Sequence, residues 1–399
     1  MRSLLICSLF LIAWKGVWIS SASAEAVIVL PGIIRSTEGV TSITLEGNDD
    51  VSVALGKQAF ALHGGFHLGQ ASDAAFIIRL ESFGNAARVS VRSGVNASVM
   101  WEAQTEGVDS SQALLRGCDR AVEYITGKPG FFAGKLAFVG KRNGTSELFT
   151  SDLMFRSVVA LTSDKALVTG TSWSPDGKKI LCTTYFKSGF PDLYVFDLEA
   201  GLRTTIASYK GTNTGGCYSP DGTRIAMVIS GSGDTELCVS DARGRDLRRL
   251  TRNRSLESGP SWSPDGSELV FTSDMQGKPQ LFTMPSKGGK VRRLATQVSR
   301  FCTEPSWNPI YADQIAFTAA TEGGFQIALY DARQGRARIL TSIRGSAVEP
   351  TWTNDGRHLI FTERKDVGTR LMLLDTLSGK ISPLHRRSFG SASSASFVY

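Results

Sequence analysis

Histidine and cysteine are scarce in this chain, which has 4 His and 6 Cys among its 399 residues. Five of the cysteines lie beyond residue 24, and none belongs to a Cys-x-x-Cys pair. This pattern excludes a cysteine-based zinc site and a framework of several disulfides, because both need thiols paired at short spacings. One disulfide is left open, and the sequence does not choose its pair. Otherwise we expect small, buried thiols.

Recognisable catalytic motifs are also missing. The chain contains no Gly-x-Ser-x-Gly turn and no glycine-rich phosphate loop that opens a helix. His63 and His67 are four residues apart, but two glycines separate them and no Glu follows His63, which favours a loop over a metalloprotease helix. The segment Asn-Asp-Asp at residues 48–50 is acidic but lacks the ligand periodicity of a calcium loop. The sequence therefore predicts no catalytic residue, no metal site and no cofactor.

The remaining composition is that of an ordinary globular protein, with 42% hydrophobic, 20% charged and 9% aromatic residues. The 41 Gly, 21 Phe and 7 Trp favour strands over helices. The net charge of +7 is uneven, because residues 25–130 carry 8 basic and 12 acidic side chains whereas residues 131–399 carry 34 and 25. Two domains of opposite charge fit this distribution.

The first 24 residues resemble an export signal. Arg2 precedes an apolar run over residues 4–13, and an Ala-Ser-Ala site follows at 22–24. The run ends before Lys15, which is short of the roughly 20 apolar residues of a spanning helix. We expect a signal peptide over 1–24, cleaved near Ala24, and an exported protein. The alternative is an N-terminal membrane anchor.

A repeat of about 45 residues organises the second half of the chain. The motif Trp-Ser-Pro-Asp-Gly and its variants begin at aromatic residues spaced by 45, 44, 45 and 45 positions. These aromatic residues are Trp173, Tyr218, Trp262, Trp307 and Trp352. Each copy continues into an alternating strand, a polar loop, a third strand and a glycine hairpin to a fourth, which is typical of a propeller blade. The Asp-Gly pairs are interpreted as turn formers and the aromatic residues as core.

Six blades fit residues 131–399. Three strands that begin near Gly134 lack a first strand, while Phe397 continues the aromatic spacing from Trp352. The C-terminal residues are therefore expected to supply the missing inner strand, which closes the ring and removes an exposed edge. In the fifth copy Asp-Gly is lost, and eight positions instead of seven separate Trp307 from Ile315, which predicts a local bulge.

The first domain, residues 25–130, is expected to be a small α/β (α+β) domain. One helix is predicted over about 111–126, where apolar residues form a stripe, Asp109 or Ser110 can cap the start and Gly127 ends it. A short connection at 127–130 follows. The predicted strands cover residues 26–30, 42–45, 51–55, 75–80, 88–91 and 97–102.

A partner surface is predicted at one mouth of the propeller channel, where loops between blades and loops between second and third strands meet. Arginines with aromatic side chains over a polar mouth suit a protein interface, although any single one of these charges could be an ordinary solvated side chain. The basic propeller also suggests nucleic acid, but the scattered charge and the export signal argue against it. The residues are Arg252, Arg254, Glu257, Arg300, Glu304, Arg344, Glu349, Phe190 and Phe325.

The chain resembles the TolB family of the Tol–Pal system in Gram-negative envelopes over roughly residues 43–399. The resemblance rests on the export signal, the Trp-Ser-Pro-Asp-Gly blades, the segments 115–119, 125–127, 130–131 and 135–139, and the blade starts Glu-Pro-Ser-Trp and Glu-Pro-Thr-Trp at 304–307 and 349–352.

This resemblance implies a six-bladed propeller behind an α/β domain, in a non-enzymatic periplasmic protein. It implies that the propeller mouth binds Pal, the peptidoglycan-associated lipoprotein, and that the mature N-terminal strand binds TolA. It also implies a role in outer-membrane integrity and in division, and contact with membranes only through partners. We expect a monomer. A propeller-type hydrolase or lyase and a carbohydrate- or peptidoglycan-binding module are the alternatives.

Overall fold

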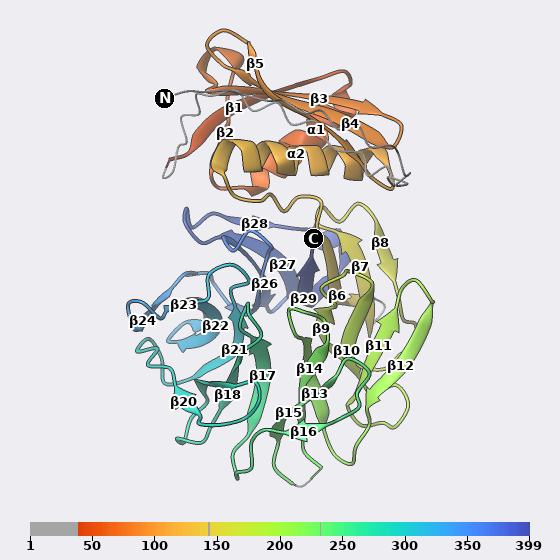
Figure 1. Cartoon of the computed structure of the whole chain (residues 1–399), viewed down its shortest axis with the longest axis vertical. Coiled ribbons are helices and arrows are strands. Elements are labelled where there is room, and N and C mark those ends of the chain that lie inside the picture. The colour runs from red at the N-terminus through yellow and green to blue at the C-terminus, as the bar shows by residue number, and fades with distance from the viewer. Residues whose placement is uncertain (1–38, 143, 232) are drawn as a thin grey trace, which may run out of the picture.

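The computed structural model describes residues 39–142, 144–231 and 233–399. A small domain of five strands and two α-helices stands on a ring of six four-stranded sheets, and the two helices lie between the small sheet and the ring (Figure 1). The predicted signal peptide and the predicted strand at 26–30 lie outside the described residues. Neither α-helix in these ranges has the length and apolar content that crossing a membrane requires.

The small domain has the strand order β2-β1-β3-β4-β5, in which β1 pairs in parallel with β2 and β3 and the remaining pairs are antiparallel. Both helices contact the sheet, so its buried apolar residues face them. The elements are β1 (Thr41–Gly47), α1 (Asp50–Leu62), β2 (Phe66–Leu68), the 3-10 turn η1 (Ala71–Asp73), β3 (Phe76–Phe83), β4 (Ala86–Ser93), β5 (Val99–Glu106) and α2 (Ser110–Thr126).

The strand predicted at residues 51–55 is wrong, because this segment is the first half of α1. Asp49 caps the helix by accepting a hydrogen bond from the Ser52 backbone N–H at 2.7 Å. Leu55, Ala59 and Phe60 then reach the same buried face. Alternating β-branched residues favoured a strand locally, but helical packing against the sheet decides the structure. The predicted helix is confirmed as α2, with Asp109 as N-cap and Gly127 in the left-handed conformation after it.

The six blades follow in chain order, and in each the first-named strand lies at the inner edge. Blade 1 is β29 (Ser391–Val398), β6 (Lys135–Arg142), β7 (Thr145–Asp152) and β8 (Val158–Ala160). Blade 2 is β9 (Val168–Trp173), β10 (Lys179–Thr184), β11 (Asp192–Asp197) and β12 (Leu202–Ala207). Blade 3 is β13 (Asn213–Tyr218), β14 (Arg224–Ile229), β15 (Glu236–Asp241) and β16 (Arg248–Arg249). Blade 4 is β17 (Glu257–Trp262), β18 (Glu268–Ser273), β19 (Gln280–Pro285) and β20 (Arg292–Arg293). Blade 5 is β21 (Cys302–Trp307), β22 (Gln314–Thr321), β23 (Gly324–Asp331) and β24 (Arg336–Ile339). Blade 6 is β25 (Ser346–Trp352), β26 (His358–Lys365), β27 (Gly368–Asp375) and β28 (Ile381–Pro383), and the 3-10 turn η2 (Arg387–Phe389) precedes β29.

The predicted closure by the C-terminus is confirmed, since β29 pairs antiparallel with β6. Phe397 lies opposite Leu136 in the register that Trp173 has opposite Ile180. The C-terminal strand therefore supplies the inner edge of blade 1 and leaves no open inner strand there.

The Asp-Gly pairs form the turns after the inner strands, as the sequence predicts. In blade 2 the Ser174 hydroxyl donates to Asp176 and accepts from the Lys179 backbone N–H, and blades 3 and 4 repeat this pattern. Hydrogen bonds, first from Ser263, lower the pKa of Asp265 to about 2. In blade 5 the longer turn places Tyr311 beside the interdomain connection, with Lys128 Nζ 5.4 Å from its ring centre.

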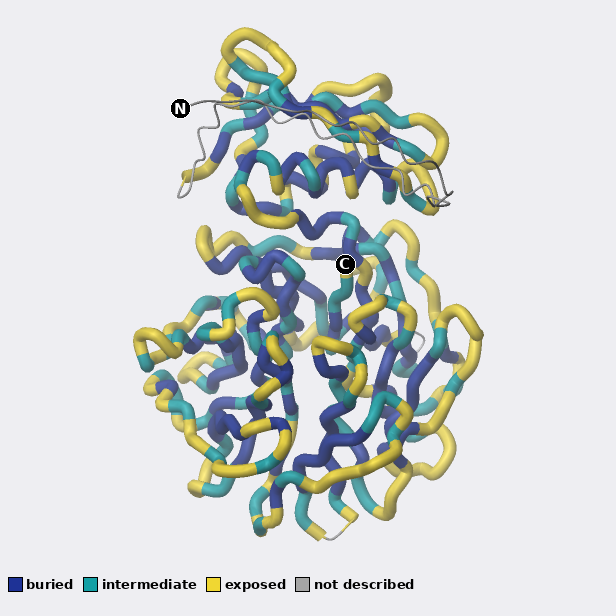
Figure 2. The backbone as a smooth tube through the Cα atoms, in the orientation of Figure 1, coloured by how far each residue is buried: buried dark blue, intermediate teal, exposed yellow. Residues whose placement is uncertain are grey.

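The core continues from the small domain into the ring. Phe131 and Phe132, which follow the connection at 127–130, are fully buried and belong to one apolar cluster with Phe60 of α1 and Ile360 of β26. In Figure 2 the backbone at this junction is coloured dark blue, which marks buried residues. The two domains therefore pack against each other through a shared apolar core and are not connected by a flexible linker alone. All five cysteines of the described residues are free thiols, and four of them are buried.

Candidate functional site

The inner strands all run in the same sense, so the ring has two different faces. We call the end where inner strands begin the open face, formed by loops at 161–167, 208–212, 250–256, 294–301, 340–345 and 384–390, together with the loops between second and third strands. The opposite end, which carries the Asp-Gly turns, is the turn face. The small domain binds the turn face: Asn354 Nδ2 donates to the Gly130 carbonyl at 2.9 Å, and Arg156 donates to the Ser111 hydroxyl at 2.7 Å.

The predicted arginines lie on the open face. Arg252, Arg254, Arg300 and Arg344 are all exposed. No ion pair or side-chain hydrogen bond joins these four to another residue in the described part of the chain. Their guanidinium groups are thus available to an acidic partner.

The predicted aromatic residues occupy the same face. Phe190 is 63% exposed in the loop between β10 and β11. Phe325 is half-buried and packs edge-on against Phe301, with ring centres 5.8 Å apart. A face that presents an exposed aromatic ring and unpaired arginines has the composition that protein interfaces favour.

The predicted acidic residue Glu257 points into the protein and not toward solvent. Its side chain is 1% exposed and accepts hydrogen bonds from Ser273, Asn253 and Thr251. Burial raises the pKa of Glu257 despite these hydrogen bonds. The carboxyl group therefore fixes the loop that carries Arg252 and Arg254.

Glu304 and Glu349 belong to a ring of β-bulges along the channel. Every inner strand shifts register once against its neighbour, and one residue at each shift has a positive φ. These six residues are Gly170, Gly215, Gly259, Glu304, Glu349 and Ser394. Glycine adopts this conformation without steric cost, whereas the other residues pay for it.

The two glutamates use this conformation to bind the next blade. Glu304 accepts hydrogen bonds from Thr318 at 2.7 Å and from the Glu349 backbone N–H at 2.9 Å. Glu349 in turn accepts from Thr362, from Arg364 and from the Ser394 backbone N–H at 2.9 Å. Burial, and then the charge of Glu349, raise the pKa of Glu304. Blades 5, 6 and 1 are therefore joined in series by carboxylates.

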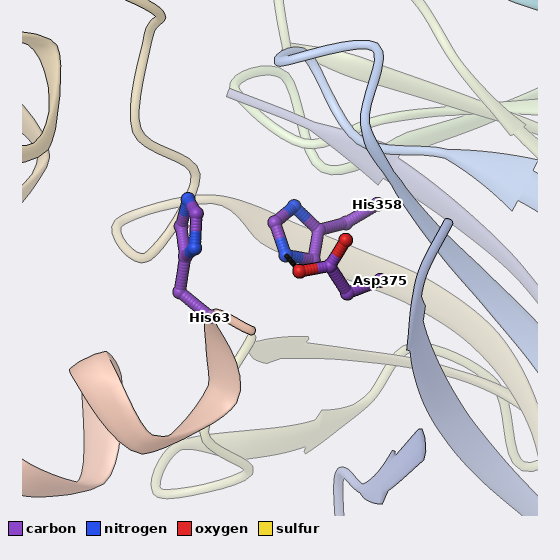
Figure 3. Close-up of side chains that lie close together, drawn as sticks. All are labelled: His63, His358 and Asp375. Atoms are coloured by element: carbon purple, nitrogen blue, oxygen red, sulfur yellow. Dashed lines mark ion pairs between the residues drawn. The ribbon is translucent and has the colours of Figure 1, made fainter. Parts of the chain in front are cut away.

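A second cluster of polar side chains lies between the small domain and blade 6 (Figure 3). His63 follows the last residue of α1, His358 opens β26, and Asp375 ends β27. They are 3%, 0% and 1% exposed. One ligand atom from each lies within 4.8 Å of the others, and the two imidazole centres are 4.6 Å apart.

Charged neighbours orient this cluster. Asp355 Oδ2 lies 2.6 Å from His358 Nδ1, and Arg357 donates to both oxygens of Asp375 at 2.9 and 2.6 Å. Burial, and then the charges of His358 and Arg357, hold the pKa of His63 well below its usual range. Burial opposes the ionisation of Asp355 and Asp375, but His358 and Arg357 with their hydrogen bonds nevertheless lower the pKa of each.

A sequence profile described as the TolB beta propeller domain matches residues 122–396. The chain belongs to the TolB beta-propeller family. "Tol-Pal system protein TolB" of Anaeromyxobacter dehalogenans is 33% identical over 154 residues, which are 39% of this chain and 35% of that protein. "Protein TolB homolog" of Chlorobaculum tepidum is 32% identical over 35% of this chain and 31% of that protein. The matched part thus spans about a third of the length of these curated relatives.

Solved structures of TolB confirm the fold. TolB from Acinetobacter baumannii superposes with a TM-score of 0.77 at 21% identity, over 94% of this chain and 99% of that one. A putative TolB from Agrobacterium tumefaciens gives 0.52 at 19% identity, over 63% and 88%. The predicted family and the six-bladed propeller behind a small α/β domain are both confirmed.

In this TolB-family chain the structure brings the predicted arginines and phenylalanines to one face and places Glu257, Glu304 and Glu349 among the contacts that hold that face. The interdomain cluster could not be predicted from the sequence, because its members are far apart along the chain. The only signal was that half of the four histidines, His63 and His358, take part in it.

The bulge ring gives a prediction for this TolB-family chain. Replacing Glu349 by Ala should lower the free energy of unfolding by about 2 kcal/mol, because three hydrogen bonds are lost while Ala keeps the positive φ. The Glu349→Gly variant should be about 1 kcal/mol more stable than Glu349→Ala, since glycine already occupies this position in blades 2–4. Denaturant unfolding measures both, with exposed Asp366→Ala as a near-neutral control. An Ala variant as stable as the Gly variant would contradict this account.

Proposed function

We propose that this chain is a non-enzymatic periplasmic scaffold of the Tol–Pal type. Its open face binds an outer-membrane lipoprotein of the Pal kind, and its N-terminal region binds a TolA-like inner-membrane protein. Through these contacts it supports envelope integrity and cell division. Membership of the TolB family and relatives named as Tol-Pal system proteins support this assignment.

The free arginines of the open face are the observation that carries the propeller contact. The same face carries four exposed arginines on three neighbouring loops, together with Phe190 and Phe325. Arginine and aromatic residues contribute most of the energy in many protein interfaces. The partner surface should therefore be acidic with an apolar centre, and Glu257, Glu304 and Glu349 would serve by fixing the loops and bulges beneath it.

A charge reversal tests the proposal. Arg300→Glu should weaken binding to a purified Pal-type lipoprotein by at least about tenfold, because like charges would then meet across the interface. Arg243→Glu is the matched control, since Arg243 is an exposed arginine in the hairpin after β15 on the turn face. The affinity is measured by titration calorimetry, and a pull-down from envelope extract tests recovery of the native lipoprotein.

Three results would reject the proposal. Equal binding by both variants would remove the open face as the contact. Failure to recover a lipoprotein, together with retention on a cell-wall column, would favour a peptidoglycan-binding module. Turnover of a peptide or glycan by the purified chain would favour an enzyme.

A further inference from the structure

The polar cluster between the two domains has the composition of a metal site. We infer that His63, His358 and Asp375 bind one divalent transition-metal ion of the zinc class, which joins the small domain to blade 6. This goes beyond scaffold function, because it concerns the turn face and not the open face.

The spacing of the ligand atoms supports the site. Zinc binds imidazole nitrogen and carboxylate oxygen at about 2.0–2.2 Å, so tetrahedral ligand atoms lie roughly 3.3 Å apart. His358 Nε2 is 3.6 Å from Asp375 Oδ2, and no two of the three ligand atoms are more than 4.8 Å apart. To complete the geometry the widest pair would have to close by about 1.5 Å, and His63, whose Nδ1 accepts a hydrogen bond from the Gly65 backbone N–H at 3.0 Å, would have to exchange that bond for the metal or change its tautomer.

His358 has the surroundings of a metal-binding histidine. In the neutral form of His358, which is the form that binds a metal, Nδ1 donates to Asp355 and the lone pair of Nε2 is directed at the cluster. Nε2 is buried and has no hydrogen-bond partner among the described residues. Such an unsatisfied buried nitrogen is costly, and a bound cation would satisfy it.

The charges around the cluster also suit a cation. Asp355 and Asp375 outnumber the single guanidinium of Arg357 by one negative charge when both imidazoles are neutral. Two nitrogen ligands and one carboxylate favour zinc, cobalt, nickel or copper over calcium and magnesium, which prefer oxygen ligands alone. Oδ1 of Asp375 already accepts from Arg357 and from the backbone N–H groups of Leu377 and Ser378, whereas Oδ2 accepts only from Arg357 and keeps a lone pair for a cation.

Position explains why such an ion would matter. His63 comes from the small domain, whereas His358 and Asp375 come from blade 6. Gly64 lies so close to Asp375 that an added Cβ would be 2.3 Å from its Oδ2. The ion would therefore add bonds across an interface that already excludes side chains at this point, and its binding should stabilise the docked arrangement.

Binding of Zn²⁺ to chelator-treated full-length chain tests the site. Calorimetry should show one Zn²⁺ per chain, and Co²⁺ should give the visible absorption of a low-coordinate site. His358→Gln and His63→Gln should each weaken Zn²⁺ binding by at least tenfold, and Asp355→Asn by about 10–100-fold. His67→Gln is the matched control, because His67 is exposed on β2, four residues from His63.

Thermal unfolding provides a second, independent measurement of binding, because an ion that binds the native state raises the Tm. Zn²⁺ should raise the Tm of the wild-type and His67→Gln chains by the same amount and that of His358→Gln by clearly less. Circular dichroism before titration confirms that each variant is folded, and Asp355→Asn keeps the test available if a ligand variant does not fold. Absence of Zn²⁺ binding to the wild-type chain, or equal weakening by His67→Gln, would overturn the inference.

Discussion

A chain that lacks residues 393–399 should melt about 10 °C or more below the full chain. The deletion removes most of the pairing between β29 and β6, the contact of Phe397 with Leu136, and the hydrogen bond from Ser394 to Glu349. Blade 1 would keep three strands and an exposed inner edge. A loss of about 5 kcal/mol or more is expected from these contacts, which corresponds to a Tm shift of this size in a large domain.

Adding the deleted strand back as a separate peptide tests whether the loss of stability comes from this strand. A synthetic peptide of residues 391–399 should bind the truncated chain as a replacement strand and raise its Tm, whereas a scrambled peptide should not. Phe397→Ala, which keeps the strand and removes one half-buried ring, should cost about 2 kcal/mol. A truncated chain that melts within 2 °C of the full chain, as measured by calorimetry, would refute closure by the C-terminus.

The contribution of Asp119 on α2 to the stability of the chain should fall as the pH rises from about 4 to 7. This carboxyl group is 2% exposed and accepts hydrogen bonds from the backbone N–H groups of Phe132 and Ala133 and from the Tyr399 hydroxyl. Burial raises its pKa to about 7 against these bonds. In this window the native carboxyl holds a proton that the unfolded one has lost, so the native state is favoured at low pH. The shift corresponds to about 4 kcal/mol.

Comparison with Asp119→Asn isolates this contribution. The difference in unfolding free energy between wild type and variant should change by up to that amount between pH 4 and 7.5, with most of the change above pH 5. Glu257→Gln, which removes another buried carboxyl in blade 4, should leave the contribution of Asp119 in place. A carboxyl ¹³C titration gives the pKa directly. A wild-type-minus-variant difference that is flat across this range would show that Asp119 stays ionised.

The propeller could be predicted because its stabilising contacts are periodic in sequence. Trp173, Tyr218, Trp262 and Trp352 each pair with an apolar residue seven positions on, and Trp307 pairs with one eight positions on, so one blade predicts the next. Phe397 obeys the same period, although it lies at the opposite end of the chain from its partner Leu136. The helix α2 could be predicted because both of its caps are local.

The features that could not be predicted depend on contacts between distant segments. Residues 51–55 favour a strand locally, whereas the Asp49 cap and the packing of Leu55 and Phe60 on the sheet stabilise the helix α1. The sequence predicts Glu304 and Glu349 to be surface charges. The sequence of one blade does not show that their carboxylates accept hydrogen bonds from backbone N–H groups of the next blade. The cluster of His63 with blade 6 forms only when the small domain docks.

Because β29 pairs with β6, the first propeller strand to be synthesised obtains its inner partner only when the last strand has been synthesised. On the ribosome, β6 emerges with its hydrogen-bonding edge bare, and that edge stays bare until residues 391–398 have been synthesised. A bare edge recruits strands from other chains. Nascent chains, and the fragments that stalled translation releases, should therefore need chaperones more than the finished ring does.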